Sequence, residues 1–393
     1  MKPLDKAPYL RDVLGKAVDD RVLAGANLLV MQHGEETCYL EAGFADISGG
    51  IKVGRDTLFR LYSMSKPVTA VAAMVLLERG QLDLAAKVSG YLPGFCAQQV
   101  MAEGDTVTPS QNEMTVHDLL FMTSGLVYGS DAHRAGRETE AVFSEIEAQL
   151  YSDHPFSTLD VANKLGACAL AFEPSTHWSY GTSADVLGAV IEVASGMRFG
   201  AFLEKELFSP LDMRDTGFFV PAEKQNRLAK VYAQGRPLSA EYHINHLGVC
   251  NKMDVAPAFE SGGAGLVSTV DDYAKFAQML LNHGALGNAR ILSPNTVRFL
   301  TSGSISPAQR REMHATMGFP GYDYGNLMRV MTEPGRALVN GTRGEYGWDG
   351  WLGTTFVNDP VHQMTFLVMM QKEDAGDVTN RLRNIVASAL DCA

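Results

Sequence analysis

The chain has 393 residues and a formal net charge of −12, and 46% of its residues are hydrophobic. This length indicates one large domain or two smaller ones, and this composition is typical of a globular protein. The excess of acidic residues argues against nucleic acid and against an anionic membrane surface as partners, because both require clustered lysine and arginine.

The N-terminal segment and the cysteines favour a cytoplasmic protein. The first 20 residues are charged throughout and contain no apolar stretch typical of a signal peptide. No apolar run in the sequence is long enough to span a bilayer. An odd number of cysteines without a CxxC pair favours reduced thiols. They are Cys38, Cys96, Cys168, Cys250 and Cys392.

Both ends of the chain predict parts of one sheet. Residues 25–46 predict two strands about a turn at His33-Gly34-Glu35, and residues 350–371 predict two more about Asn358-Asp359-Pro360. Residues 377–390 have helical periodicity, whereas residues 104–208 contain mostly helical patterns and loops. We therefore expect an α/β fold in which helices flank a sheet built from both chain ends. The expected sheet domain comprises residues 1–100 and 225–393, and a mostly helical domain of residues 101–224 is inserted.

The segment SMSKPVTAVAAMVLLERG, from Ser63 to Gly80, predicts a buried helix. Pro67 has no N–H and is tolerated only in the first turn, so the helix begins no earlier than about Met64. Gly80 is a plausible C-terminal stop. A helix that is apolar on all faces is buried, so its N-terminus lies inside the protein or at the floor of a cleft.

Ser63 and Lys66 are three residues apart and therefore share one face of this helix. A serine hydroxyl needs a base, and a desolvated lysine near the positive helix end loses its proton more easily. The helix dipole favours an oxyanion at Ser63, whereas Ser65 points elsewhere. Ser63 is thus the predicted nucleophile. The alternative is a capping serine followed by a lysine that extends to solvent, because S-x-x-K alone is a common pattern.

Five segments, in order, resemble the class C β-lactamase and penicillin-binding-protein-like serine hydrolases. The resemblance spans roughly residues 20 to 390 and implies a β-lactamase-like fold with an antiparallel sheet. The segments are residues 59–95 with the S-x-x-K box, 115–126 as the linking segment, 177–196 with Tyr180 as the second-box tyrosine, 260–282 with a Gly-rich loop, and 345–359 with the third box.

Two boxes depart from the family pattern. The second box is usually Y-x-N, but here it is Tyr180-Gly181-Thr182. The third box is usually K-T-G, but here it is Trp348-Asp349-Gly350. A W-x-G at this place resembles the family VIII carboxylesterases, relatives that hydrolyse simple esters. The W-x-G in place of K-T-G argues against efficient β-lactam hydrolysis and against action on peptidoglycan.

The resemblance implies roles for particular residues. Ser63 attacks the ester carbonyl, and Lys66 and Tyr180 together move the proton; which of the two is the base stays open. The oxyanion is held by the backbone N–H groups of Ser63 and Trp351. The expected substrate-binding residues are Trp348, Gly350 and Thr182. Tyr180 could instead be a core tyrosine of the helical domain.

The resemblance therefore implies a serine hydrolase of short-chain, uncharged carboxylic esters that forms an acyl-enzyme and needs no cofactor or metal. Its expected partner is a small-molecule ester. Alternatives are an amidase, a peptidase or an acyltransferase on the same scaffold, a penicillin-recognising protein with weak β-lactamase activity, and an inactive scaffold. The ten histidines have no metal-ligand spacing. We expect His117, His177, His243 and His246 to be structural or surface groups.

Overall fold

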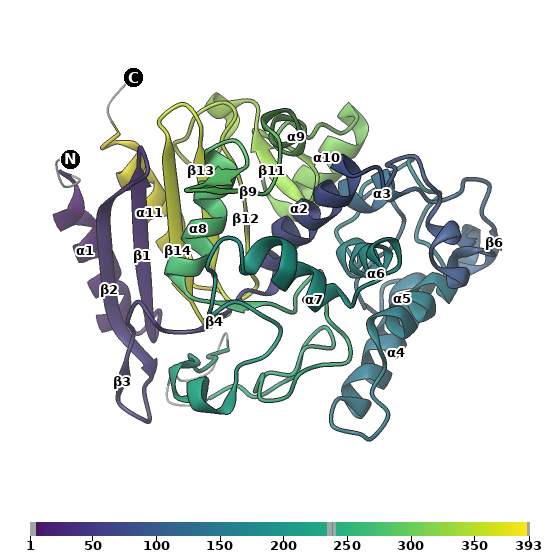
Figure 1. Cartoon of the computed structure of the whole chain (residues 1–393), viewed down its shortest axis with the longest axis horizontal. Coiled ribbons are helices and arrows are strands. Elements are labelled where there is room, and N and C mark those ends of the chain that lie inside the picture. Colours follow the sequence, from purple (N-terminus) through teal and green to yellow (C-terminus); the bar gives the residue numbers. More distant parts are fainter. Residues whose placement is uncertain (1–4, 234–237, 239–240, 391–393) are drawn as a thin grey trace.

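The computed structural model describes residues 5–233, 238 and 241–390 of the chain. Its centre is an antiparallel sheet of eight strands in the order β10-β11-β12-β13-β14-β1-β2-β3 (Figure 1). The strands are β1 (Gly25–Gln32), β2 (Glu35–Asp46), β3 (Ile51–Lys52), β10 (Tyr322–Gly325), β11 (Met328–Met331), β12 (Tyr346–Asp349), β13 (Thr355–Asp359) and β14 (Met364–Met370). The predicted sheet is confirmed, and so is the α/β class.

The two ends of the chain meet in the middle of this sheet. β1 pairs with β14 from Ala26 opposite Met370 to Gln32 opposite Met364. The predicted turn after β1 is confirmed: His33 and Gly34 both have positive φ, 52° and 79°, as a tight hairpin turn requires. The predicted hairpin of β13 and β14 is confirmed as well, but its turn comprises residues 360–363, because Asn358 and Asp359 still pair with Thr365 and Met364 in the ladder. The pairing of β1 with β14 joins strands from both ends of the chain into one continuous sheet, against which the intervening elements pack.

Alternate side chains of the central strands pack against helices on opposite faces of the sheet. Leu28 and Val30 of β1 face α1 (Ala7–Asp19) and α11 (Val378–Ala387). Leu29, between them, belongs to the larger core on the other face, which also contains α2 (Ser65–Glu78) and α8 (Val270–Leu281). The predicted C-terminal helix is therefore confirmed, and α2 lies in the interior.

The middle of the chain is mostly helical, as predicted. The helices there are α3 (Val116–Phe121), α4 (Arg134–Gln149), α5 (Thr158–Ala167), α6 (Ser183–Ser195) and α7 (Phe199–Leu203), and a short hairpin of β5 (Gln99–Met101) and β6 (Val107–Pro109) precedes them. α2 packs against α6, so α2 joins the sheet to this helical region. The division at residues 100 and 225 stays a prediction.

Short elements complete the fold around this frame. They are β4 (Phe59–Arg60), β7 (Val267–Ser268), β8 (Ala285–Leu286), β9 (Ala289–Arg290), α9 (Pro294–Leu300) and α10 (Pro307–Met317). The four described cysteines are free thiols, and Cys392 lies outside the described residues. In the part of the chain that the structure describes, no single helix is long and apolar enough to cross a membrane. One pair bent by 74°, Ser183–Ser195 with Phe199–Phe208, has the length and composition to do so.

Candidate active site

Ser63 lies in a single 3-10 turn, Tyr62–Met64, that leads directly into α2. Every residue of α2 from Ser65 to Leu76 is buried, which confirms the predicted buried helix. Tyr62 has a positive φ of 43°, a rare conformation for a bulky residue that must be held by its surroundings. Its buried ring packs edge-on against Trp351, with 5.0 Å between ring centroids. Ser63 thus follows a locally constrained backbone.

The Lys66 amine lies at the centre of a hydrogen-bonded group. Lys66 Nζ is 3.1 Å from Ser63 Oγ, 3.0 Å from the Tyr128 hydroxyl and 2.8 Å from the Gly263 carbonyl oxygen. The lysine side chain is fully buried, so these three partners replace its hydration. The structure therefore brings Ser63 and Lys66 together as their spacing predicts.

Tyr128 is a member of the site that the sequence did not reveal. The linking segment recognised in the sequence ends at Leu126, two residues earlier, and a loop tyrosine has no periodicity that marks it. Burial raises the pKa of Tyr128 well above its ordinary value, and the neighbouring Tyr180 adds to the effect. The hydroxyl therefore stays protonated at neutral pH, so it can accept from Lys66 and still donate its own proton.

Ser65 has a structural environment instead. Its side chain is fully buried, and its hydroxyl accepts a hydrogen bond of 3.0 Å from the backbone N–H of Leu266. Ser63 Oγ, in contrast, lies at the wall of a cavity. This geometry is consistent with the preference, made from the sequence, for Ser63 over Ser65 as the nucleophile.

The Gly-rich loop that begins at Glu260 holds the acceptor for Lys66. Asp185, in the first turn of α6, accepts hydrogen bonds from Ser261 Oγ at 2.5 Å and from the Gly263 N–H at 3.0 Å. Burial raises the pKa of Asp185, although Lys66 and these hydrogen bonds oppose that effect. Asp185 thereby fixes the Gly263 peptide, whose carbonyl oxygen accepts from the lysine.

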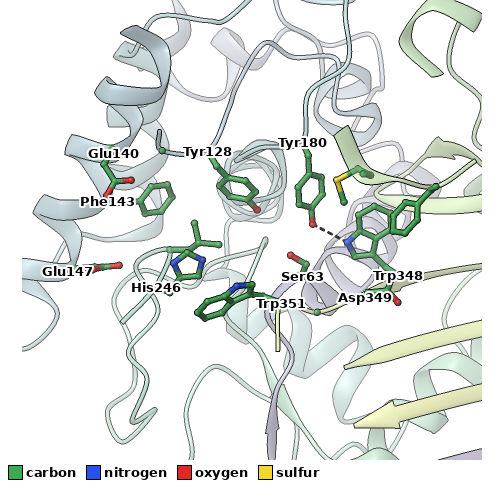
Figure 2. Close-up of a pocket in the computed structure, with 15 residues that line it drawn as sticks. Ser63, Tyr128, Glu140, Phe143, Glu147, Tyr180, His246, Trp348, Asp349 and Trp351 are labelled. Carbon is green, nitrogen blue, oxygen red and sulfur yellow. Dashed lines mark hydrogen bonds between the residues drawn. The ribbon is translucent and has the colours of Figure 1, made fainter. Parts of the chain in front are cut away.

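Tyr180 and Trp348 are joined by a hydrogen bond. The indole N–H of Trp348 on β12 donates to the Tyr180 hydroxyl at 3.0 Å (Figure 2). Lys66 Nζ lies 4.8 Å from the centroid of the Tyr180 ring, and no hydrogen bond joins this amine to the Tyr180 hydroxyl within the described residues. The rings of Tyr128 and Tyr180 meet edge-on at 5.6 Å. The two tyrosines thus flank the amine.

The third box brings the end of β12 against the backbone that precedes Ser63. A Cβ at Gly350 would lie 2.3 Å from the Leu61 carbonyl oxygen and 2.1 Å from Thr354 Oγ1, so only glycine allows this approach. In the described part of the chain, the backbone N–H groups of Ser63 and Trp351 donate to no protein acceptor. Two unpaired donors beside Ser63 are consistent with the predicted oxyanion hole, a role that stays a prediction.

A cavity of about 410 Å³ opens at Ser63. Five predicted residues line it, namely Ser63, Tyr180, Trp348, Gly350 and Trp351. Further lining residues are Tyr128, Gly129, Glu140, Phe143, Glu147, His246, Leu247, Met317, Phe319 and Asp349. Thr182 is not among them: it is fully buried just before α6, and its hydroxyl has no partner within the described residues. The structure does not bring Thr182 to the substrate.

Several lining residues were missed or assigned elsewhere. His246 was expected to be structural or at the surface, yet it lines the cavity with its ring centroid 4.2 Å from that of Trp351. Burial lowers the pKa of His246. Glu140, Phe143 and Glu147 come from α4, which carries no recognised motif. Within the described residues, no group of three His, Cys, Asp or Glu side chains could hold a metal ion.

Comparison with known proteins identifies the family of the chain. Residues 10–390 match the Beta-lactamase family. The chain is 30% identical to Esterase EstB of Burkholderia gladioli over 406 residues, which cover 97% of this chain and 95% of EstB. The chain therefore belongs to the Beta-lactamase family and is a serine hydrolase of the β-lactamase type.

Two solved structures show the same fold along almost the whole chain. EstCE1, described as a hydrolase with promiscuous acyltransferase activity, has a TM-score of 0.80 and 24% identity, with 97% of this chain and 98% of EstCE1 covered. A family VIII carboxylesterase has a TM-score of 0.72 and 20% identity, with 99% of each chain covered. The β-lactamase-like fold predicted from the five segments is confirmed.

Proposed function

We propose that this chain is a carboxylesterase of the family VIII type that hydrolyses short-chain carboxylic esters through an acyl-enzyme on Ser63. The observation that carries the proposal is the 3.1 Å contact between Lys66 Nζ and Ser63 Oγ at the wall of a cavity. A base at hydrogen-bond distance from a serine hydroxyl is the arrangement that nucleophilic catalysis requires. The 30% identity to an esterase supports the ester as substrate.

The geometry supports a simple course of proton transfer. As the base, the Lys66 amine donates its N–H groups to Tyr128 and Gly263 and takes the Ser63 proton with its lone pair. Ser63 Oγ then bonds to the ester carbonyl carbon, and the carbonyl oxygen becomes an oxyanion beside the N–H groups of Ser63 and Trp351. Lys66 and Tyr180 return the proton to the departing alcohol. Water attacks the acyl-enzyme by the reverse path and releases the acid.

The third box supports discrimination against anionic esters. Trp348 stands where the K-T-G relatives place a lysine, and the described residues that line the cavity include no lysine or arginine. Asp349, on the same wall, is paired with Arg329, whose Nη2 lies 3.0 Å from Asp349 Oδ1. A carboxylate on the substrate would meet no cation here.

We also propose that the protein is located in the cytoplasm. This proposal rests on the sequence alone, and cell fractionation tests it.

The test is turnover of p-nitrophenyl acetate and butyrate by the wild type and by Ser63→Ala. We expect Ser63→Ala to lose at least about 10⁴-fold in kcat/KM, because a nucleophile acts as one unit with its base. Ser65→Ala is the matched control and should stay active, since its hydroxyl only accepts from Leu266. A fluorophosphonate probe should label the Ser63 peptide. An active Ser63→Ala protein, or a label on Ser65, would refute the proposal.

Acyl transfer is the second candidate, because EstCE1 is described as having promiscuous acyltransferase activity. An alcohol in place of water would release the acyl group as a new ester. Adding a short alcohol during hydrolysis and measuring the ester and acid products separates the two reactions. A chromogenic cephalosporin tests the remaining alternative: a stoichiometric burst followed by no turnover indicates a penicillin-recognising protein.

A further inference from the structure

One wall of the cavity is formed by α4. Glu140, Phe143 and Glu147 are spaced by three and four residues, which places them on one face of this helix. They lie on the same side of Ser63 as His246, across the cavity from Trp348 and Asp349 (Figure 2). We call Glu140, Phe143 and Glu147 the acidic wall.

The carboxylates of the acidic wall lack the ion pairs that other carboxylates of α4 make. Glu138 is paired with Arg134 at 2.6 Å, and Glu145 is paired with Lys164 at 2.7 Å. Within the described residues, neither Glu140 nor Glu147 pairs with a cation, and Glu147 receives only a long bond of 3.4 Å from the Gly248 N–H. The helix thus neutralises carboxylates away from the cavity and leaves those facing it uncompensated.

Among the described residues that line the cavity, no other group compensates this charge. His246 loses its positive charge more easily because burial lowers its pKa. Lys66 lies behind Ser63 and already has three hydrogen-bond partners. Asp349 on the opposite wall is ion-paired with Arg329, so the acidic wall is where the cavity's net negative charge resides.

The environment of Glu147 makes a cationic partner favourable. Burial raises the pKa of Glu147, and the nearby charge of Glu140 adds to this effect. A cation beside both carboxylates would relieve both costs. Gly129 leaves room for the Glu140 carboxylate, since a Cβ there would lie 2.0 Å from Glu140 Oε2. The aromatic rings of Phe143, Tyr128 and Trp351 also line the cavity, and aromatic faces attract ammonium groups.

We infer that the preferred substrates are esters that carry a cationic group, of the ammonium class, on the part that lies against the acidic wall. This inference rests on the proposed function, because it concerns the substrate of the same cavity. Neutral esters remain substrates but lack this contact, whereas carboxylate-bearing esters meet two uncompensated negative charges.

Matched esters test the inference. p-Nitrophenyl 4-(trimethylammonio)butyrate and p-nitrophenyl 5,5-dimethylhexanoate have the same shape and leaving group, and they differ in charge on the acyl side. Acetylcholine and 3,3-dimethylbutyl acetate form the corresponding pair on the alcohol side. In at least one pair, we expect kcat/KM for the cationic ester to exceed that of its neutral isostere by about tenfold or more, as a charge-assisted contact in a partly buried site implies.

The variant that removes the charge is Glu147→Gln, with Glu140→Gln and the double variant beside it. The cationic preference, measured as the ratio of kcat/KM for the cationic ester to kcat/KM for its neutral isostere, should fall by about tenfold in the double variant. Glu145→Gln, on the same helix but paired with Lys164, should leave the preference unchanged. Added salt should reduce the preference of the wild type.

Two results would overturn the inference: equal kcat/KM for both members of both pairs, or a cationic preference that survives the double variant. Hydrolysis of neutral esters without a cationic preference would remove this inference and leave the proposed function intact. If the wild type hydrolyses none of the esters, the proposed function fails. The inference is then tested by the affinities with which the protein binds the same esters. Calorimetry of the intact esters with Ser63→Ala should then give the same order of affinities, and equal affinities would refute it.

Discussion

The two sides of the cavity are built in opposite ways. Around Ser63, the hydrogen-bonded centre consists of two groups: Lys66 bonds to Ser63 and Tyr128, and Trp348 bonds to Tyr180. On the acidic wall, Glu140 and Glu147 have no cationic partner within the described residues. Polar side-chain atoms are paired within the protein on the Ser63 side, whereas the carboxylates of the acidic wall are left without cations in the part of the chain that the structure describes. We therefore expect the chemistry to take place on the Ser63 side and the acidic wall to recognise the substrate.

This difference has a measurable consequence. Groups that share one proton path fail together, so their substitutions should be strongly non-additive. Groups that contact a distant part of the substrate should act independently of the chemistry and change only the choice of substrate. Substitutions in the hydrogen-bonded centre should therefore lower turnover of every ester, unlike those of the acidic wall.

The largest effect within the centre, after loss of Ser63 itself, is expected for Lys66 and Tyr180. Lys66→Ala and Tyr180→Phe should each lower kcat/KM for p-nitrophenyl butyrate by on the order of 10² to 10⁴. The double variant should be little worse than the poorer single variant, because both groups move the same proton. The measurement is kcat/KM for the four proteins. Losses that multiply would show that the two residues act separately. They would contradict the proposed difference between the hydrogen-bonded centre and the acidic wall.

Tyr128→Phe should have a smaller effect. It removes the hydroxyl that accepts from Lys66 at 3.0 Å and keeps the ring. Lys66 becomes an ammonium group when it takes the Ser63 proton, and a hydrogen bond to a charged group contributes about 1.5–3 kcal/mol, so we expect kcat/KM to fall by about tenfold to a hundredfold. Tyr324→Phe is the matched control: its hydroxyl is buried without a partner in the described residues, and its ring packs against Trp348. Equal losses in both variants would reduce Tyr128 to a packing role.

The sequence predicted the parts of the fold that depend on local pattern. The hairpin at His33-Gly34 and the buried helix after Ser63 follow from turn residues and from apolar residues on every face. The pairing of β1 with β14 brings together residues more than 300 positions apart. The sequence suggested it only because both ends looked like sheet, and the sheet order required the structure.

The candidate site divides in the same way. Ser63, Lys66, Tyr180 and Trp348 lie in segments whose order and spacing mark them. Tyr128 lies in a loop and the acidic wall on an ordinary amphipathic helix, where a glutamate that faces a cavity has the same sequence pattern as one that faces solvent. Thr182 shows the opposite error: it occupies a motif position, yet its side chain is buried away from the cavity.

The smallest effect expected in the centre concerns Trp348, and it tests whether this residue belongs with the chemistry or with recognition. Trp348 is only 2% exposed, and its N–H donates to Tyr180 at 3.0 Å. Trp348→Phe keeps an aromatic ring and removes that donor. A net contribution of about 1 kcal/mol for a neutral hydrogen bond predicts roughly a fivefold fall in kcat.

The smaller ring will also lower the free energy of unfolding, so stability alone cannot decide the role of Trp348. The deciding measurement is therefore the same substitution in a Tyr180→Phe background, where the acceptor is already absent. If Trp348 acts by positioning the Tyr180 hydroxyl, it should then cause no further loss for any ester. A full additional loss, or a loss confined to one member of a matched ester pair, would move Trp348 from the hydrogen-bonded centre to the recognition side of the cavity.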